Sequence, residues 1–420
     1  MRSPAFLMTI LAIMVLLDIY VFQAVKLVSN GANPKTRLII YILYWSLSAL
    51  TIIFLLLMAF TNFESWPRVL RTYLFATVLG LFFAKLIAVV FFLLDDIRRV
   101  IQWAAGKIFF RNTEEEGFSN QGISRSLFLS WLGIGAGSAL FGSLIYGFTN
   151  KYNYQVKRIK LTYDNLPKSF KGLKIIHISD IHSGSFTDKQ AVNKGVDKIL
   201  KENADIILFT GDIVNDRAVE MENYMDVFSR LKAPMGVYST LGNHDYGDYH
   251  YGHNPVGQRA VEKAENLKRV KALHGELGWK LMLDEHTVLE KNGEQIALIG
   301  VQNISGSPRF HTYGDLGKAY TGAEKYPFKI LMSHDPSHWD AEVQPKYSDI
   351  DLTLAGHTHG MQFGVEIPGF KWSPVQYVYK EWAGLYEVNK QKIYVNRGYG
   401  FIGYPGRVGI LPEITVIELV

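Results

Sequence analysis

Carboxylate, imidazole and amide side chains follow five separate apolar segments of the sequence, and this combination of residue types suits a metal site. The peptides that carry them are "SDIHSG", "TGDIVND", "LGNHDYG", "SHDP" and "AGHTHG". Their chemically useful residues are Asp180, His182, Asp212, Asn243, His244, Asp245, His334, His357 and His359. The chain contains no cysteine, so a metal bound here must take nitrogen and oxygen ligands.

Each of these residues also has an ordinary structural explanation. A carboxylate such as Asp212 could cap the helix that follows it, Asn243 could belong to a turn, and His334 could be a hydrogen-bonded core histidine. A pair such as His357 and His359 also occurs in ordinary loops. All of these explanations would have to hold together at five places along the chain, so we favour a shared site.

The pair of histidines in "AGHTHG" illustrates how the backbone could aim two ligands at one point. In an extended chain alternate side chains lie on the same face, so His357 and His359 would point the same way. Gly356 and Gly360 flank them and allow a sharp turn and a close approach.

The segments in front of the polar residues have the composition of β-strands. Strands are expected at 173–179, 205–211, 236–242, 295–301, 328–334 and 349–357, and helices at 191–203 and 221–233. This β-α-β-α-β order predicts an α/β sheet whose strands end at one edge, where ligands bind in such sheets. The tail strands "GLYEV", "KIYVNRG" and "EITVIELV" predict a second sheet packed against the first.

The ordered set D-x-H, G-D-x-x-N-D, G-N-H-D, H and G-H-x-H resembles the calcineurin-like metallophosphoesterase family, in its membrane-anchored bacterial type. The resemblance spans residues 173–360. It implies a four-layered α/β fold, with two mixed β-sheets flanked by helices, and two divalent metals bridged by one carboxylate. It further implies that Asp180, His182 and His359 hold the first metal. Asn243, His334 and His357 would hold the second, and Asp212 would bridge both.

The resemblance gives His244 a different role from the ligands: it would contact the scissile phosphate and protonate the leaving group, with Asp245 orienting it. The pKa of histidine suits such proton transfer. A ligand between two cations must be an anion, which fits Asp212. The donor set of imidazole, carboxylate and amide favours Mn²⁺, Fe or Zn²⁺ over Mg²⁺.

The front of the chain predicts a membrane region of residues 1–150, followed by a phosphoesterase domain of residues 151–420. Four apolar runs, at about 5–25, 38–60, 73–94 and 127–148, each have the ~20 residues that a membrane-crossing helix needs. Four such runs cannot be one cleavable signal peptide. The segment 95–111 would either lie on the membrane surface as an amphipathic helix or extend the third crossing.

Two ionisable residues interrupt the apolar runs, Asp18 in the first and Lys85 in the third. Both lie at a similar depth, thirteen residues after Ala5 and twelve after Tyr73, and the two crossings run in the same direction. We expect Asp18 and Lys85 to pair; the alternative is that each side chain reaches separately toward a membrane surface.

The distribution of basic residues favours an extracytoplasmic catalytic domain. With that topology the outer segments before it carry three basic residues, Arg2, Arg68 and Arg71, and the inner loops carry eight, which are Lys26, Lys35, Arg37, Arg98, Arg99, Lys107, Arg111 and Arg125. Basic residues concentrate on the inner side of membrane proteins, whereas long translocated domains escape this rule.

These features together predict a membrane-anchored, metal-dependent hydrolase. It would cleave a phosphodiester or pyrophosphate bond with the help of two divalent metal ions, on an envelope or lipid-linked substrate in the lipid bilayer. The net charge of +5 is spread along the chain, so nucleic acid is not an expected partner. Two alternatives remain: a cytoplasm-facing enzyme similar to UDP-2,3-diacylglucosamine pyrophosphatase, and a non-catalytic binding or sensor protein on the same fold.

Overall fold

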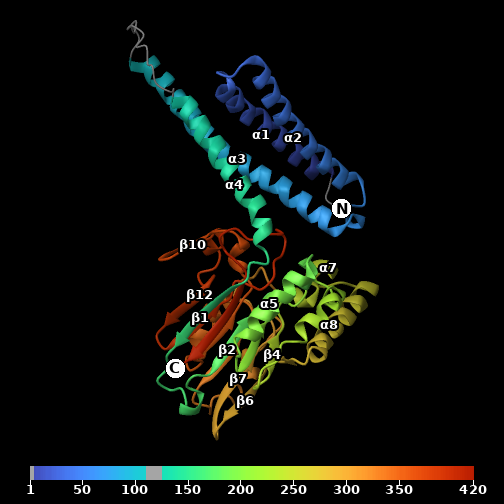
Figure 1. The fold of residues 1–420 in the computed structure, drawn as a ribbon, viewed down its shortest axis with the longest axis vertical. Coiled ribbons are helices and arrows are strands. Elements are labelled where there is room, and N and C mark those ends of the chain that lie inside the picture. Colours follow the sequence, from blue (N-terminus) through green and yellow to red (C-terminus); the bar gives the residue numbers. More distant parts are fainter. Residues whose placement is uncertain (1–3, 110–124) are drawn as a thin grey trace. The chain divides into compact units, whose positions relative to one another are not determined.

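The computed structural model describes residues 4–109 and 125–420 (Figure 1). The chain divides into two compact units, Met1–Tyr146 and Gly147–Val420, which we call the membrane unit and the soluble unit. Arg2 and Arg111, both counted above for the topology, lie outside the described residues.

Four long helices make up the described part of the membrane unit: α1 (Pro4–Ser29), α2 (Pro34–Phe60), α3 (Arg68–Phe109) and α4 (Arg125–Asn150), with a short 3₁₀ helix at Phe63–Ser65. All four are long and apolar enough to cross a membrane, and they contain the four expected spans. Many large apolar side chains on them are exposed, as expected for surfaces that face lipid. The segment 95–109 continues α3 without a break, which agrees with the extension and not with a separate surface helix.

The expected pairing of the two intramembrane charges is confirmed. The ammonium group of Lys85 on α3 donates a hydrogen bond to Asp18 on α1, and it lies 3.3 Å from the hydroxyl of Ser48 on α2. Both charged side chains are buried. The hydroxyl of Tyr44 donates to the main-chain oxygen of Asp18 at 2.7 Å. Three helices of the unit are therefore joined through one polar cluster.

The soluble unit contains two mixed six-stranded sheets (Figure 1). The first has the order β1-β14-β2-β3-β4-β5. Its strands are β1 (Gln155–Leu161), β2 (Lys174–Ile178), β3 (Ile206–Thr210), β4 (Val237–Thr240), β5 (Lys280–Leu281) and β14 (Glu413–Leu419). The second has the order β12-β13-β9-β8-β7-β6. Its strands are β6 (Glu285–Lys291), β7 (Glu294–Gly300), β8 (Lys329–Met332), β9 (Leu352–Ala355), β12 (Gly384–Val388) and β13 (Gln391–Val395). The strands β10 (Val365–Ile367) and β11 (Phe370–Trp372) form a separate two-stranded ribbon.

Helices cover the outer faces of both sheets. The longer ones are α5 (Lys189–Lys201) and α8 (Gln258–Glu276); the short ones are α6 (Met225–Phe228), α7 (Asp248–Tyr251), α9 (Leu316–Tyr320) and α10 (Gln344–Lys346). The 3₁₀ turns are at Lys168–Phe170, Ser183–Ser185, Ala218–Tyr224, His244–Tyr246, His359–Gln362 and Pro374–Tyr377, and a π turn spans Trp339–Val343.

Three apolar clusters between these layers account for the four-layered fold. Ile176 on β2 packs with Val196 of α5 in the outer cluster of the first sheet, while its neighbour Ile175 packs in the cluster shared by the two sheets. On the second sheet, Leu331 packs with Trp339 on the other outer face. Consecutive strand residues thus enter different layers, as the alternation of a β-strand requires.

The fold departs from expectation in two places. The helix expected at 221–233 is a 3₁₀ helix at Ala218–Tyr224 followed by the four-residue α6, because the buried apolar residues 218, 221, 224 and 227 repeat every three positions. The tail strands do not all join the second sheet: β14 lies in the first sheet, parallel to β1 and antiparallel to β2.

Candidate metal and catalytic site

The nine predicted residues come together where five strands end. Asp180 and His182 follow β2, Asp212 follows β3, and Asn243, His244 and Asp245 follow β4 of the first sheet. His334 follows β8, and His357 and His359 follow β9 of the second sheet. The parallel pairings β2–β3, β3–β4 and β8–β9 bring the carboxyl ends of these strands side by side. The site therefore lies between the ends of the two sheets.

Five of the candidate ligand residues sit in tight turns rather than in extended chain. Asp180, His182, Asp212, His357 and His359 have φ angles of 54°, 46°, 62°, 69° and 50°, in the left-handed region. Strand β9 has already ended at Ala355, so the extended geometry expected for the histidine pair is not the one found. Left-handed backbone in residues other than glycine is unfavourable, and it gathers at functional sites.

The turns of the two sheets approach each other so closely that one position requires glycine. A Cβ atom at Gly356 would lie 1.9 Å from the hydroxyl of Ser179 and 2.3 Å from a carboxylate oxygen of Asp180. Glycine in "AGHTHG" therefore allows the second sheet to bring its histidines against the loop after β2.

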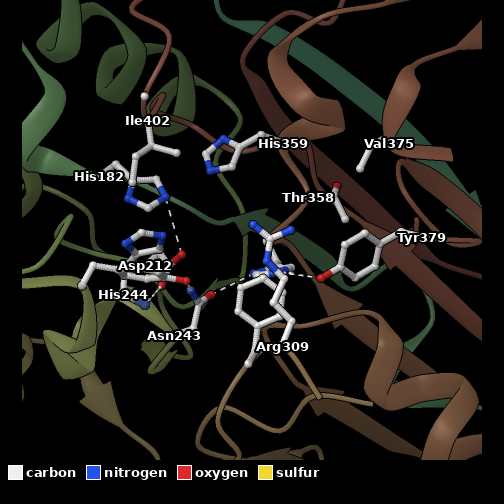
Figure 2. A pocket seen from close by; sticks show the side chains of 14 residues that line it. His182, Asp212, Asn243, His244, Arg309, Thr358, His359, Val375, Tyr379 and Ile402 are labelled. Carbon is white, nitrogen blue, oxygen red and sulfur yellow. Dashed lines mark hydrogen bonds and ion pairs between the residues drawn. The ribbon is translucent and has the colours of Figure 1, made fainter. Parts of the chain in front are cut away.

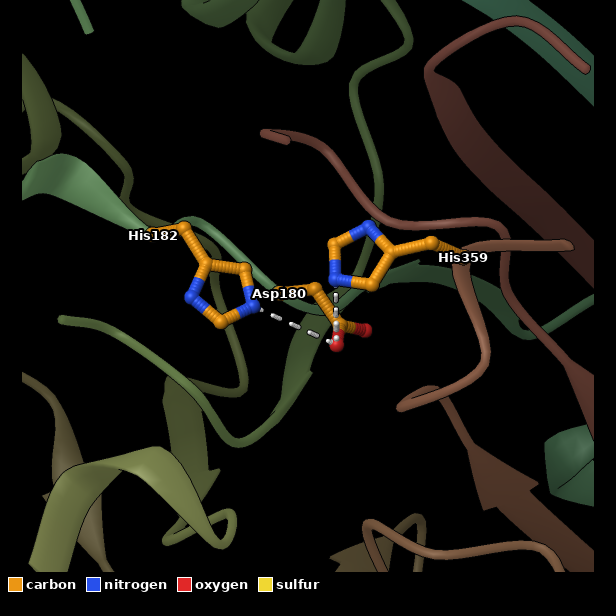
Figure 3. A group of neighbouring side chains, drawn as sticks. All are labelled: Asp180, His182 and His359. Atoms are coloured by element: carbon orange, nitrogen blue, oxygen red, sulfur yellow. Dashed lines mark ion pairs between the residues drawn. The ribbon is translucent and has the colours of Figure 1, made fainter. Parts of the chain in front are cut away.

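The first ligand cluster consists of Asp180, His182 and His359, all buried (Figure 3). Nε2 of His359 lies 3.2 Å from Oδ1 of Asp180, and Nε2 of His182 lies 3.9 Å from the same oxygen. One potential ligand atom from each residue lies within 4.8 Å of the other two. Three converging donors of this kind suit a divalent cation.

The second cluster consists of Asp212, His334 and His357, with Asn243 beside them. The amide oxygen Oδ1 of Asn243 lies 2.8 Å from Nδ1 of His357 and 3.2 Å from Nε2 of His334, and these two nitrogens are 3.2 Å apart. The carbonyl oxygen of Thr210 lies 2.6 Å from Nδ1 of His334 and accepts a hydrogen bond from it, which leaves Nε2 as the candidate ligand atom.

One oxygen of Asp212 lies between the two clusters. Its Oδ2 is 3.5 Å from Nε2 of His182 in the first cluster (Figure 2). The same oxygen is 3.1 Å from Nε2 of His334 in the second cluster. Its other oxygen, Oδ1, accepts a hydrogen bond from the main-chain N–H of His244 at 2.9 Å. This hydrogen bond fixes the carboxylate in the position from which it reaches both clusters.

The residues present fit a pair of divalent cations. Both ring nitrogens of His182 are buried without a hydrogen-bond partner among the described residues, which is costly unless a ligand binds them. All the donors are nitrogen or oxygen atoms, and two of the residues are carboxylates. A cation in each cluster would satisfy the unpartnered nitrogens and offset the buried negative charge.

Burial and mutual attraction set the protonation states of the ligands. Burial lowers the pKa of His182 and His359, so both are held neutral, the form that binds metal. Although burial opposes it, the charge of His334 lowers the pKa of Asp212. Burial lowers the pKa of His334, but the carboxylate of Asp212 outweighs burial and raises this pKa to about 10. A cation that binds Nε2 of His334 would therefore displace its proton.

His244 lies at the edge of the site and is held by the main chain. Its Nδ1 lies 2.7 Å from the carbonyl oxygen of Asn215 and donates to it, so Nε2 is the nitrogen available to a substrate. The ring of Tyr249 stacks on the imidazole with a centroid distance of 4.5 Å. We expected Asp245 to orient His244; the orienting group in the structure is the carbonyl of Asn215.

Asp245 instead holds two of the site loops together. Its Oδ2 accepts hydrogen bonds from the main-chain N–H groups of Asp212 and Gly242, both at 2.9 Å. Its Oδ1 accepts from Ile213 at 2.9 Å and from Val214 at 3.3 Å. The side chain is completely buried. This carboxylate thus fixes the loop of Asp212 against the loop of Asn243.

A pocket of about 330 Å³ opens over the ligand residues (Figure 2). Four further segments line it: Tyr249 after β4, Arg309 and Phe310 after β7, Val375 and Tyr379 after β11, and Ile402 and Gly403 after β13. None of these wall residues belongs to the five polar peptides from which the site was predicted.

Tyr379 joins the pocket wall to a ligand. Its hydroxyl lies 2.8 Å from Nε2 of His357, on the opposite side of the ring from the second cluster. Arg397, just after β13, is buried and paired with Glu413 at 2.5 Å and Glu366 at 2.9 Å. It supports the fold beneath the site.

Two family models match the chain. One described as "Calcineurin-like phosphoesterase" matches residues 173–361, and one described as "Probable Calcineurin-like phosphoesterase, transmembrane domain" matches residues 1–151. Together they account for most of the chain, and they separate the membrane helices from the loops that carry the ligand residues.

Several proteins are similar to this chain at low identity. A "Transmembrane protein with metallophosphoesterase domain" from Danio rerio is 27% identical over 280 residues, which cover 66% of this chain and 60% of that protein. "Phosphodiesterase YaeI" from Escherichia coli is 27% identical over 252 residues, covering 59% of this chain and 82% of YaeI. An "Uncharacterized metallophosphoesterase" from Helicobacter pylori strain J99 is 27% identical over 360 residues, covering 85% of each chain.

Proposed function

The chain belongs to the calcineurin-like phosphoesterase family, and from this premise we propose that it is a membrane-anchored hydrolase of phosphodiester or pyrophosphate bonds that uses two divalent metal ions. The observation that carries the proposal is the position of Asp212 Oδ2, 3.5 Å from a ring nitrogen of one ligand cluster and 3.1 Å from a ring nitrogen of the other. A carboxylate placed in this way can serve two cations at once.

The ligand residues would divide into two sets. Asp180, His182 and His359 would hold one cation, and Asn243, His334 and His357 the other, with Asp212 shared between them. Bound divalent cations supply Lewis-acid chemistry, because they acidify water and neutralise charge on phosphate oxygens. The imidazole-rich donor set favours Mn²⁺, Fe or Zn²⁺.

His244 is the proposed proton donor to the leaving group. Its Nδ1 proton is held by the carbonyl of Asn215, which directs Nε2 into the pocket that the ligand residues share. An imidazolium at this position can donate its Nε2 proton to a departing alkoxide at neutral pH. Arg309, also at the pocket wall, presents a fixed positive charge for phosphate oxygens.

The test is a metal and turnover assay on the purified full chain in detergent. The assay offers Mn²⁺ or Zn²⁺ and compares a phosphomonoester, a phosphodiester and a nucleotide-linked pyrophosphate. We expect His244→Ala to keep wild-type metal content while turnover falls by about 10²- to 10⁴-fold, most for substrates with poor leaving groups. Asp212→Asn should lose both metal and activity. A metal-free, inactive wild type, or equal metal loss in both variants, would refute the proposal.

We further propose that the substrate resides in the membrane and that the soluble unit faces the extracytoplasmic side. The four membrane helices restrict the enzyme to the bilayer, where a lipid-linked phosphoester would be concentrated beside it. The excess of basic residues in the loops assigned to the inner side supports this topology. Since the chain lacks cysteine, a single cysteine at exposed Lys390 would report the side through labelling of intact cells with an impermeant maleimide. Labelling that appears only after lysis would place the soluble unit in the cytoplasm.

A further inference from the structure

The ribbon β10–β11 exposes an apolar face. Its cross-strand pairs Val365–Trp372 and Ile367–Phe370 place four apolar side chains on the same side of the ribbon, which we call the apolar ribbon face. The exposed fractions of Val365, Ile367 and Phe370 are 43%, 58% and 55%. These four residues present a contiguous apolar surface to whatever surrounds the soluble unit.

The opposite side of the ribbon is polar and is turned toward the rest of the soluble unit. Glu366 pairs with Arg397 at 2.9 Å and with Lys157 at 3.2 Å. Lys371 donates a hydrogen bond to the main-chain oxygen of Ala383 at 2.5 Å. In a water-soluble protein a ribbon normally buries its apolar face and exposes its polar one. Here the arrangement is reversed, and ion pairs hold the ribbon in place.

The segment after the ribbon extends the same kind of surface. Tyr377 and Val378 are 76% and 73% exposed, and the indole N–H of Trp372 lies 3.4 Å from the hydroxyl of Tyr377. Aromatic side chains mixed with aliphatic ones are typical of surfaces that sit at the boundary between lipid and water.

Contacts within the soluble unit place the ribbon near the end of the last membrane helix. The final turn of α4 belongs to this unit, and the carbonyl oxygen of Gly147 accepts a hydrogen bond from the N–H of Arg407 at 2.9 Å. The rings of Phe148 and Tyr404 are 5.5 Å apart. The residue after Arg407 is Val408, and its carbonyl oxygen accepts a hydrogen bond at 2.8 Å from the N–H of Gly364, which lies directly before β10. A single short segment thus contacts both the helix end and the base of the ribbon.

We infer that the apolar ribbon face, together with Tyr377 and Val378, inserts into the surface of the lipid bilayer. The apolar span of α4 ends at the residues that contact this segment, so the boundary of the bilayer passes close to the ribbon. A lipid surface also matches the chemistry of the face, which is apolar and aromatic and whose charged residues point away from it.

The surface has a consequence for the reaction, and this part rests on the proposed function. Val375 and Tyr379, which follow the ribbon, and Ile402, which precedes the segment that contacts α4, all line the pocket over the ligand residues (Figure 2). A phosphoester carried by a membrane lipid would therefore reach the metal ligands from the bilayer surface, with its apolar portion beside the ribbon.

The insertion is tested by fluorescence quenching on the full chain, which has no native cysteine to remove. Single-cysteine variants Ile367→Cys and Phe370→Cys are labelled with an environment-sensitive fluorophore and reconstituted into phosphatidylcholine vesicles with and without nitroxide-labelled lipid. The control is Glu290→Cys at the exposed end of the β6–β7 hairpin, far from β10 within the soluble unit (Figure 1).

Both ribbon positions should show a blue-shifted emission and at least twofold quenching by the nitroxide lipid, and the control should show neither. Equal quenching at all three positions, or none at the ribbon, would overturn the inference. A third result would also overturn it: disulfide-linked dimers of the unlabelled Ile367→Cys variant, without quenching of the labelled one, would show that a second copy of the chain covers the face.

Turnover separates lipid delivery from catalysis. The double variant Ile367→Ser/Phe370→Ser should hydrolyse a soluble aryl phosphodiester within twofold of wild type, and a phosphodiester embedded in vesicles at least tenfold more slowly. An equal loss on both substrates would overturn the delivery role. If wild type cleaves neither substrate, the proposed function fails, while the quenching result still decides whether the ribbon enters the bilayer.

Discussion

Replacing Asp245 with asparagine should strongly destabilise the soluble unit while keeping the size of the side chain. Each oxygen of this carboxylate accepts two main-chain N–H groups, from Asp212 and Gly242 at one oxygen and from Ile213 and Val214 at the other. In Asp245→Asn one oxygen becomes an NH₂ group, so two buried N–H donors lose their acceptor and face another donor.

The size of the effect follows from the number of donors left without a partner. A buried donor without an acceptor costs about 1–3 kcal/mol, so two such donors give about 2–6 kcal/mol. The stability of a typical domain is only about 5–15 kcal/mol, so the variant loses a large part of it. The displaced loops carry Asp212 and Asn243, and we therefore expect metal affinity to fall as well.

The measurement is a urea titration of the full chain in mild detergent, read by pulse proteolysis of the soluble unit. The titration is run at pH 8, where the Asp245 carboxyl is ionised. Burial, followed by the negative charge of Asp212, raises the pKa of Asp245 to about 7. The control is Asp188→Asn at the N-terminus of α5, where the side chain accepts from the N–H of Ala191 at 3.0 Å. Asparagine caps helices as well as aspartate, so this change should stay within about 0.5 kcal/mol.

A free energy of unfolding for Asp245→Asn within about 0.5 kcal/mol of the wild type and of the Asp188→Asn control would contradict this prediction. Such a result would show that water or a rotated amide satisfies the four donors. It would also remove the explanation offered here for the position of the Asp212 loop.

Three further predictions concern other buried contacts. Lys85→Met should destabilise the membrane unit by about 3–5 kcal/mol, because it leaves Asp18 buried without its partner, and the exchanged pair Asp18→Lys/Lys85→Asp should recover the thermal midpoint measured in detergent. Tyr379→Phe should lower metal affinity about 10- to 100-fold in a competition titration, since it removes the hydroxyl beside Nε2 of His357, without changing the circular dichroism spectrum. Although burial opposes it, the paired arginine lowers the pKa of Glu413. The unfolded chain therefore binds more protons below about pH 4.3, and the wild type should lose stability between about pH 5 and 3 more steeply than Glu413→Gln in urea titrations.

The sequence was sufficient to pick out the residues that converge at the strand ends, because their signal is local. Each follows a short apolar strand, and β2, β3 and β4 lie inside the segments expected for them. How each loop turns was not evident from the sequence. An extended chain would place His357 and His359 on one face, whereas both residues adopt left-handed backbone after the strand has ended. Such turns depend on the opposing sheet, which local patterns do not describe.

Contacts between distant parts of the chain were likewise beyond local patterns. Asp245 was expected to act on His244 because the two are adjacent, but its partners are main-chain groups around Asp212 and Gly242. The pairing of Asp18 with Lys85 was predictable because helical rise alone gives the depth of each residue in the membrane. The sequence predicts a contact when the regular rise of a helix gives the position of both residues. It does not predict a contact between two loops that are distant in the chain.

The placement of β14 also constrains how the soluble unit is made. Among the described residues, strand β1 is held in its sheet through β14 alone, which pairs with it over residues 413–419. During synthesis β1 therefore emerges long before its partner exists, and all four membrane helices leave the ribosome earlier still. Until residues 413–419 have been made, β1 has no strand to pair with, so the first sheet closes last of all.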